Sequence, residues 1–233
     1  MAEDADRLAT GAPAGEQLVI YGNGQVAELA LTRFVSDTRH RVLGFTVDAA
    51  FIRQPVLHGL PVVPFDDVER QFPPDRVRMF VAVGPTQCNR IRAERFEQAR
   101  RRGYRFASYV SSRAFVAEGA VVGENAAIGE GVIVHPFVRI GDNVHVGTAS
   151  VISHHCVLGD HSFLAVGCLL AGNVKVGARS FLGARATVRD HVTIGEASVV
   201  GTGVTVLRNV VASSVLVAAE PVLLPVDSAS VKL

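Results

Sequence analysis

From residue 116 onward, an aliphatic residue recurs at every sixth position of the chain. The fifteen positions of this register hold only Val, Ile or Leu, namely Val116, Val122, Ile128, Val134, Ile140, Val146, Ile152, Leu158, Leu164, Leu170, Val176, Leu182, Val188, Ile194 and Val200. The next residue is glycine in nine of the fifteen hexads, and the fifth residue is always Ala, Val, Ser or Cys. A period of six matches neither an amphipathic helix nor an alternating strand, so it predicts a repeat architecture.

The repeat predicts a three-sided prism of stacked coils. One aliphatic and one small side chain per hexad fill the interior, and glycine at the corners permits tight turns. Three hexads make one triangular coil of 18 residues, and the fifteen hexads make about five coils, stacked roughly 4.8 Å apart. Neighbouring coils bury each other's apolar rows. We therefore expect an all-β domain, a parallel β-helix with a C-terminal tail, over residues 112–233, in which residues 18 apart lie on adjacent coils.

Residues 17–111 show a different pattern, in which short apolar runs alternate with amphipathic segments. Strands are predicted over 18–21, 42–47, 60–63, 79–83 and 106–110, and helices over 25–35, 66–72 and 89–102. This alternation is typical of an α/β sheet with mostly parallel strands. We expect Asp66 to cap the second helix and the arginines of the third helix to form a solvated face. Residues 1–16 have no apolar periodicity and are expected to be a disordered tail.

Composition narrows the class of protein. Lys and Arg number 23 against 22 Asp and Glu, so neither part of the chain is a basic domain that binds nucleic acid by charge. The three cysteines, Cys88, Cys156 and Cys168, have no CxxC spacing, which argues against a disulfide framework or a Cys-rich zinc site. The most apolar stretch, 210–226, is broken by Ser, Glu and Pro, and no signal peptide is recognisable. We expect a cytoplasmic protein without nucleic-acid or membrane partners.

A glycine-rich turn follows the first predicted strand. Gly22, Gly24 and Gln25 lie where backbone N–H groups at the start of a helix can meet a phosphate. The second strand ends at Asp48, where a carboxylate can meet a ribose hydroxyl or a base edge. Taken alone the turn is a weak signal, and Asp48 is equally well explained as an ordinary turn residue.

The hexads resemble the left-handed parallel β-helix of the hexapeptide acyltransferases. The order of the two domains, together with VIYGNGQVAE (19–28), GFTVD (44–48), SYVSS (108–112), SHHCVLGDHSF (153–163) and AGNVKVGARSFLGARATV (171–188), is similar to sugar acyltransferases of the sialic-acid O-acetyltransferase and bacillosamine N-acetyltransferase type. The similarity covers about residues 17–221. It implies a Rossmann-like domain over 17–111 that binds a nucleotide-linked sugar. It also implies a homotrimer that moves an acetyl or longer acyl group from acyl-CoA to the sugar amine in surface-polysaccharide biosynthesis, without a metal.

The resemblance also implies catalytic residues. His154 matches the family's general-base histidine, and an imidazole can take a proton from an attacking amine near neutral pH. His155 stands where many relatives have Asp or Glu, so the orientation of the base differs here, and His155 itself is an alternative base. Gly172, 18 residues after His154, matches the turn whose backbone N–H faces the thioester oxygen.

The resemblance also implies residues that contact the sugar substrate and CoA. Phe163 replaces a histidine that many relatives have nine residues after the base, which predicts a more apolar pocket for a longer acyl group or a more deoxygenated sugar. Gln25 also replaces a histidine that is common in relatives. Lys175, Arg185 and Arg189 are candidates to pair with the CoA phosphates.

Three alternatives remain open on these residues. A sugar O-acetyltransferase differs only in the acceptor atom. A zinc carbonic anhydrase on the same prism uses two histidines five residues apart, whereas His154 and His155 are seven and six residues from His161. The third alternative is a non-catalytic scaffold.

Overall fold

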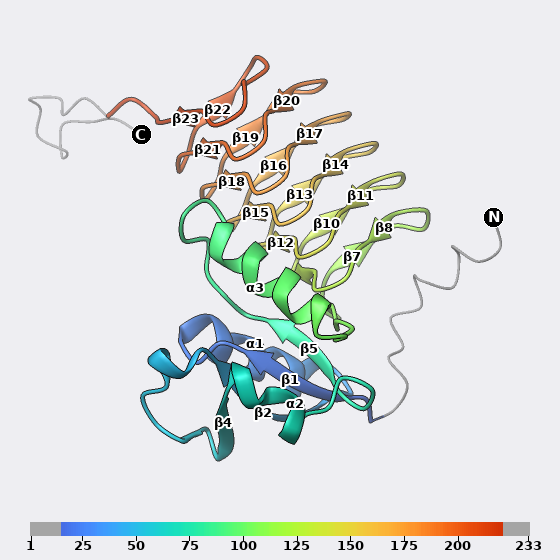
Figure 1. Ribbon diagram of the computed structural model, residues 1–233. Helices are drawn as coiled ribbons and strands as arrows, with labels where there is room; N and C mark the ends of the chain where they lie inside the picture. The colour runs from blue at the N-terminus through green and yellow to red at the C-terminus, as the bar shows by residue number, and fades with distance from the viewer. Residues whose placement is uncertain (1–14, 221–233) are drawn as a thin grey trace, which may run out of the picture.

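The hexads fold as strands of two residues each, and the aliphatic position is always the second residue. The computed structural model describes residues 15–220 (Figure 1). The strands of the β-helix are β6 (Tyr109–Val110), β7 (Phe115–Val116), β8 (Val121–Val122), β9 (Ala127–Ile128), β10 (Ile133–Val134), β11 (Arg139–Ile140), β12 (His145–Val146), β13 (Val151–Ile152), β14 (Val157–Leu158), β15 (Phe163–Leu164), β16 (Leu169–Leu170), β17 (Lys175–Val176), β18 (Phe181–Leu182), β19 (Thr187–Val188), β20 (Thr193–Ile194), β21 (Val199–Val200), β22 (Thr205–Val206) and β23 (Val215–Leu216).

These strands form three parallel sheets, which are the faces of the prism. The first face contains β7, β10, β13, β16, β19 and β22, the second β8, β11, β14, β17 and β20, and the third β6, β9, β12, β15, β18, β21 and β23. Nearly every pairing joins residues 18 apart, such as Val151 with Leu169, which confirms the predicted coil length. We call these the first, second and third faces.

The interior of the prism is filled as the sequence predicts. The aliphatic positions from Ile128 to Val200 and the small fifth residues between them are at most 2% exposed. Fully burying a Val, Leu or Ile side chain contributes about 1.5–3 kcal/mol, so the stacked rows are the main stabilising term of this domain.

The N-terminal domain contains a sheet of order β3-β4-β2-β1-β5. Its elements are β1 (Gln17–Tyr21), α1 (Gln25–Asp37), β2 (Arg41–Val47), a 3₁₀ turn (Ala49–Phe51), β3 (Val56–Leu57), β4 (Leu60–Pro64), a second 3₁₀ turn (Phe65–Asp67), α2 (Val68–Gln71), β5 (Arg78–Val81) and α3 (Arg90–Arg101). All pairs are parallel except β3 with β4; β2 is the middle strand, and β1 lies between β2 and the edge strand β5. This is the arrangement of a small Rossmann-like sheet, which confirms the predicted fold class.

Two local expectations in this domain are wrong. The strand expected over 106–110 is divided, because Phe106 bridges Met79 of the α/β sheet whereas Tyr109 and Val110 pair with β9 of the prism. Asp66 does not cap a helix; its carboxylate instead accepts a hydrogen bond from Arg102 at 3.0 Å.

The expected tails lie mostly outside the described residues, which leave out 1–14 and 221–233. The division of the chain between residues 111 and 112 stays a prediction. Among residues 15–220, no helix has the length and apolar character needed to cross a bilayer.

Helix α3 lies between the sheet and the prism (Figure 1). Arg92 of α3 is only 4% exposed, and its guanidinium donates to the backbone oxygen of His161 at 2.7 Å and to Oδ1 of Asn143 at 3.0 Å. Asn125 continues this contact, because its side chain exchanges two hydrogen bonds with the backbone of Val81. The expected solvated face of α3 is therefore wrong for Arg92. It is also wrong for Arg100, which pairs with Asp142 of the prism at 2.7 Å.

A second contact between the domains is made by Asp37 at the end of α1. Its carboxylate accepts hydrogen bonds from Tyr109 Oη at 2.9 Å, Ser111 Oγ at 3.1 Å, and both the backbone N–H and the hydroxyl of Ser112. These bonds, with that of the Ser112 hydroxyl the largest, lower the pKa of Asp37 to about 2. The ionised form is therefore stabilised in the folded protein.

We predict that Asp37→Asn lowers stability at pH 7 by about 2 kcal/mol, or roughly 4–8 °C in Tm. Because the folded pKa lies below the unfolded value, the contribution of Asp37 is present above pH 4 and is lost as the pH falls toward 2. The Tm difference between wild type and variant should therefore shrink over that window in thermal melts. Asp75→Asn, at an exposed carboxylate, is the control; a difference that stays constant from pH 7 to 3 would contradict the prediction.

Candidate active site

The turn between β13 and β14 brings His154 and His155 to the edge where the first and second faces meet. Both side chains are exposed, and His155 has a left-handed backbone with φ 60°. On the next coil, the same turn position is occupied by Gly172 and Asn173. The backbone N–H of Asn173 donates to the carbonyl of His154 at 3.0 Å, which holds the two turns together.

The His154 ring lies directly over Gly172. A Cβ added at Gly172 would lie 2.6 Å from Cε1 and 2.9 Å from Nε2 of His154, distances that no real side chain tolerates. Only glycine at this position leaves room for the imidazole. Within residues 15–220 the backbone N–H of Gly172 has no hydrogen-bond acceptor. One edge thus presents an imidazole and a free N–H donor side by side, which are the groups that acyl transfer requires.

The two imidazoles contact each other and an aromatic ring. Nδ1 of His154 lies 3.1 Å from Nδ1 of His155, and the ring of His155 packs against Phe137 with centroids 4.8 Å apart and planes inclined by 37°. Phe137 is 61% exposed and comes from the equivalent turn one coil earlier. The sequence reasoning missed Phe137, although its position 18 residues before His155 was a signal that pointed to it.

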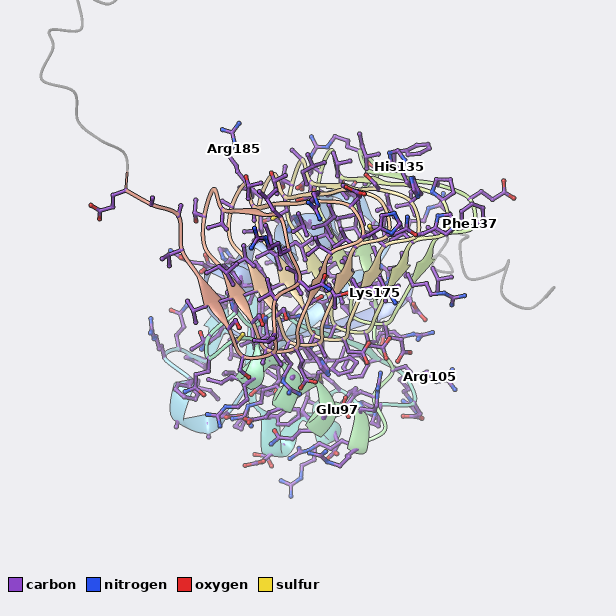
Figure 2. All side chains as sticks on the ribbon, turned by 90° about the horizontal axis from the view of Figure 1, so that it is seen from above. Glu97, Arg105, His135, Phe137, Lys175 and Arg185 are labelled. Carbon is purple, nitrogen blue, oxygen red and sulfur yellow. The ribbon has the colours of Figure 1, made fainter. Side chains whose placement is uncertain are left out.

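The candidate CoA-binding residues do not all lie at this edge. Arg189 is exposed and follows Ala171 by 18 residues, so it belongs to the equivalent turn one coil after Ala171 and Gly172. Lys175 lies on β17 of the second face. Arg185 lies on a different edge, in the turn between β18 and β19, and Figure 2 shows it well away from Lys175.

The predicted phosphate-binding turn has the expected backbone. Gly22 has φ 124°, and a Cβ there would lie 2.7 Å from the carbonyl oxygen of Ala82, so glycine is required. Gly24 precedes the first residue of α1, and Gln25 is exposed at the start of that helix. This turn therefore leaves the N-terminus of α1 open to an anion.

Asp48 is held by partners within the domain. Its carboxylate accepts from Tyr21 Oη and from Arg95 of α3, both at 2.6 Å. Burial and this hydrogen bond raise the pKa of Tyr21. Sequence reasoning missed Arg95, because its partner is 47 residues away and no local pattern marks the pair.

Phe163 lies on the third face, opposite the edge that carries His154. Its ring stacks on His145 at 4.2 Å and on Phe181 at 5.6 Å, and the guanidinium of Arg92 lies 5.8 Å from its centroid. Within one chain, the structure therefore does not bring Phe163 and His154 together.

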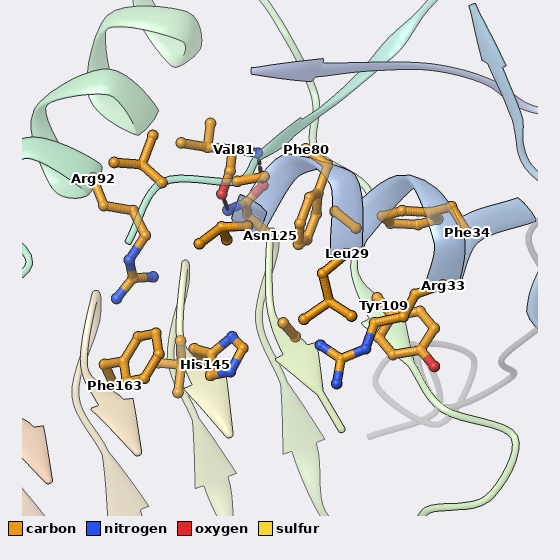
Figure 3. A pocket seen from close by; sticks show the side chains of 16 residues that line it. Leu29, Arg33, Phe34, Phe80, Val81, Arg92, Tyr109, Asn125, His145 and Phe163 are labelled. Atoms are coloured by element: carbon orange, nitrogen blue, oxygen red, sulfur yellow. Dashed lines mark hydrogen bonds between the residues drawn. The ribbon is translucent and has the colours of Figure 1, made fainter. Parts of the chain in front are cut away.

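Phe163 instead lines a small cavity between α1 and the third face (Figure 3). The cavity measures about 40 Å³, and α1 contributes Val26, Leu29 and Arg33 to its wall. His145 also lines it, and burial together with the nearby Arg92 lowers the pKa of His145 to about 3. His145 is therefore a neutral ring in a largely apolar pocket.

The side chains that could ligate a metal are dispersed. Among residues 15–220, no three His, Cys, Asp or Glu side chains are gathered closely enough to hold a metal ion. The three cysteines are free thiols, and Cys156 and Cys168 are buried inside the prism.

Comparison with known proteins identifies the family. Residues 173–208 match the family model described as bacterial transferase hexapeptide (six repeats). No curated protein sequence matches the chain. Among solved structures, PerB from Caulobacter crescentus, in complex with CoA and GDP-perosamine, has a TM-score of 0.75 and 31% identity and covers 85% of this chain and 92% of its own.

Two more distant structures share the fold. The acetyltransferase domain of PglB from Neisseria gonorrhoeae FA1090, in complex with acetyl coenzyme A, has a TM-score of 0.75 at 22% identity, and covers 86% of this chain and 95% of its own. WeeI from Acinetobacter baumannii AYE has a TM-score of 0.73 at 19% identity, with the same coverage. The shared fold and the PerB match confirm the resemblance inferred from the hexads and from the order of the domains. The chain therefore belongs to the hexapeptide-repeat sugar N-acetyltransferases of the left-handed parallel β-helix class.

Proposed function

We propose that this protein transfers an acetyl group from acetyl-CoA to the amine of a nucleotide-linked amino sugar in surface-polysaccharide biosynthesis, with His154 as general base. The observation that carries the proposal is the contact between the His154 ring and Gly172, whose N–H has no acceptor among the described residues. PerB was solved with CoA and GDP-perosamine, and the same enzyme was also solved with one histidine replaced by alanine or by asparagine. These neighbours support CoA as the co-substrate and an amino sugar as the acceptor.

The chemistry follows from the two groups at the edge. Nε2 of His154 accepts the proton that the sugar amine loses as its nitrogen attacks the thioester carbonyl. The Gly172 N–H donates to the oxygen of that carbonyl as negative charge develops on it. The new C–N bond forms, the C–S bond breaks, and the proton on His154 passes to the departing thiolate. The products are the N-acetylated sugar and CoA.

The homotrimer is part of the same proposal. The phosphate-binding turn at Gly22–Gln25 begins α1, which faces the third face of the prism, whereas His154 lies at the opposite edge. A sugar bound at that turn reaches an imidazole only if a second copy brings its own His154 edge alongside. The exposed apolar side chains Phe115, Ile133 and Leu169 on the first face are suited to packing between copies. In this arrangement CoA lies between two prisms, with Lys175, Arg185 and Arg189 available to its phosphates.

The test is a substrate panel combined with a mass measurement. Purified protein is incubated with acetyl-CoA and UDP-, GDP- or dTDP-linked amino sugars, each matched by the same sugar with a hydroxyl in place of the amine. We expect CoA release and a product heavier by one acetyl group only with an amino sugar. Acetylation of the hydroxyl sugars would identify an O-acetyltransferase instead, and no turnover or CoA binding would favour the scaffold. A series of longer acyl-CoAs tests the expectation from Phe163, which a steep preference for acetyl would remove.

A further inference from the structure

His155 and Phe137 form a chain of contacts that ends on His154. Nδ1 of His155 lies 3.1 Å from Nδ1 of His154. The His155 ring also packs against the Phe137 ring, with centroids 4.8 Å apart and planes inclined by 37°. His155 lies above Phe137 because the two residues are 18 apart and occupy the same turn position on adjacent coils. The backbone N–H of His155 also donates to the carbonyl of Pro136 at 3.4 Å.

The backbone at Phe137 is costly for an aromatic residue. Phe137 has φ 65°, in the left-handed region that bulky side chains rarely adopt. The same turn position has a positive φ on the neighbouring coils as well, at Gly119, His155, Asn173 and His191, so the conformation is imposed by the corner of the prism. The ring is also 61% exposed, so it is not needed to fill the core.

We propose that Phe137 and His155 are positioning residues that hold His154 in the tautomer with a free Nε2. This inference rests on the proposed function, in which Nε2 of His154 accepts the amine proton. A neutral imidazole carries one proton, so a free Nε2 requires the proton of His154 to be on Nδ1. Nδ1–H of His154 then donates to Nδ1 of His155, and His155 carries its own proton on Nε2. Phe137 keeps the His155 ring in the plane that this hydrogen bond needs.

The arrangement makes activity sensitive to protonation of either imidazole. If His155 gains a second proton, its Nδ1 becomes a donor and no longer accepts from His154. His154 then accepts through Nδ1 and holds its proton on Nε2, where it cannot act as a base. Within residues 15–220, neither imidazole has an ion pair or hydrogen bond with a charged side chain. The charged or titratable groups on the adjoining turns and strands are Glu118, His135, Arg139, Lys175, Arg189, Asp190 and His191.

The experiment measures kcat/KM against pH with the best acceptor from the panel. Wild type should lose activity on the acid side with a slope of about one proton, because a proton on either imidazole already removes the base and a second positive charge beside it is disfavoured. His155→Asp should keep activity within about threefold at its optimum, because a carboxylate also accepts from Nδ1 of His154. Its acid limb should have a slope of one and lie at higher pH, because the negative charge favours protonated His154. His155→Ala should lower kcat by about 10- to 100-fold with KM unchanged for both substrates.

Phe137 supplies a matched pair. Phe137→Ala should lower kcat about 5- to 10-fold, whereas Phe137→Tyr, which keeps the ring, should restore it. All these side chains are exposed, so thermal melts should be unchanged, and His155→Asn serves if His155→Ala does not fold. Wild-type kcat in His155→Ala together with an acid limb of His155→Asp that coincides with that of wild type would overturn the inference. Failure of the proposed function is distinct, since it would be seen as no transfer by wild type or as full turnover by a variant lacking His154.

Discussion

His154→Ala should lower kcat by about 10²- to 10⁴-fold, the usual contribution of a general base. The amine must lose a proton as it attacks the thioester, and without the imidazole only water is left to take it. KM for acetyl-CoA and for the sugar should change little, because the ring contacts Gly172 and His155 and does not hold either substrate in the proposed arrangement. Steady-state kinetics of CoA release, followed with a thiol reagent, measure both parameters.

The fold of the His154→Ala variant should be unaffected, since the side chain is exposed and its ring makes no contact with the interior of the prism. His58→Ala is the matched control, because His58 is a half-exposed histidine of the N-terminal domain whose nearest charged partner is Glu28, at 3.8 Å. The control should retain wild-type turnover and melting temperature. Turnover within a few-fold of wild type in His154→Ala would remove His154 as the base and would direct attention to His155.

The β-helix was predictable from sequence to the residue because its period is local. The residue types within each hexad predict where its strand, its corner and its inward side chain lie, and three hexads give the 18-residue coil. The contact between His154 and Gly172 could therefore be expected before any coordinates, as could the stack of Phe163 on Phe181. Local strands elsewhere were less certain. The segment 106–110 has the pattern of a single strand, but Phe106 pairs with the α/β sheet and Tyr109–Val110 pair with the prism. The five residues contain no signal for the point at which the chain leaves the first sheet and joins the second.

The junction between the domains was not predictable in the same way. Arg92 donates to the backbone of His161, 69 residues away, and Arg95 pairs with Asp48, 47 residues away. On the sequence of α3, these arginines are indistinguishable from Arg90, which remains exposed. Whether an arginine of α3 is solvated depends on where the prism lies against that helix, and a single sequence carries no periodicity that relates the two. The 18-residue coil places Phe163 one coil before Phe181, but the distance of Phe163 from His154 within one chain depends on how the triangular coil closes.

Gly172→Ala should lower kcat about 10²-fold while the fold is retained. The added methyl group would lie 2.6 Å from Cε1 of His154, so the imidazole must swing away from the position beside the Gly172 N–H. A displacement of about 1 Å of a catalytic group can cost 10²-fold in rate. The clash involves only a movable, exposed side chain, so the melting temperature should fall by no more than a few degrees.

Gly177→Ala provides the contrast, because the methyl group there would collide with the backbone nitrogen of Glu196 on the next coil. Backbone cannot swing aside, and overpacking of this kind costs about 1–3 kcal/mol, so this variant should lose stability first. The decisive measurement is a double-mutant cycle with His154→Ala. If Gly172→Ala acts by displacing the imidazole, it should reduce the activity of wild type about 10²-fold but leave the residual activity of His154→Ala unchanged. Equal losses in both backgrounds would mean that the methyl group blocks the acyl chain or the N–H itself, and that the imidazole and Gly172 act independently.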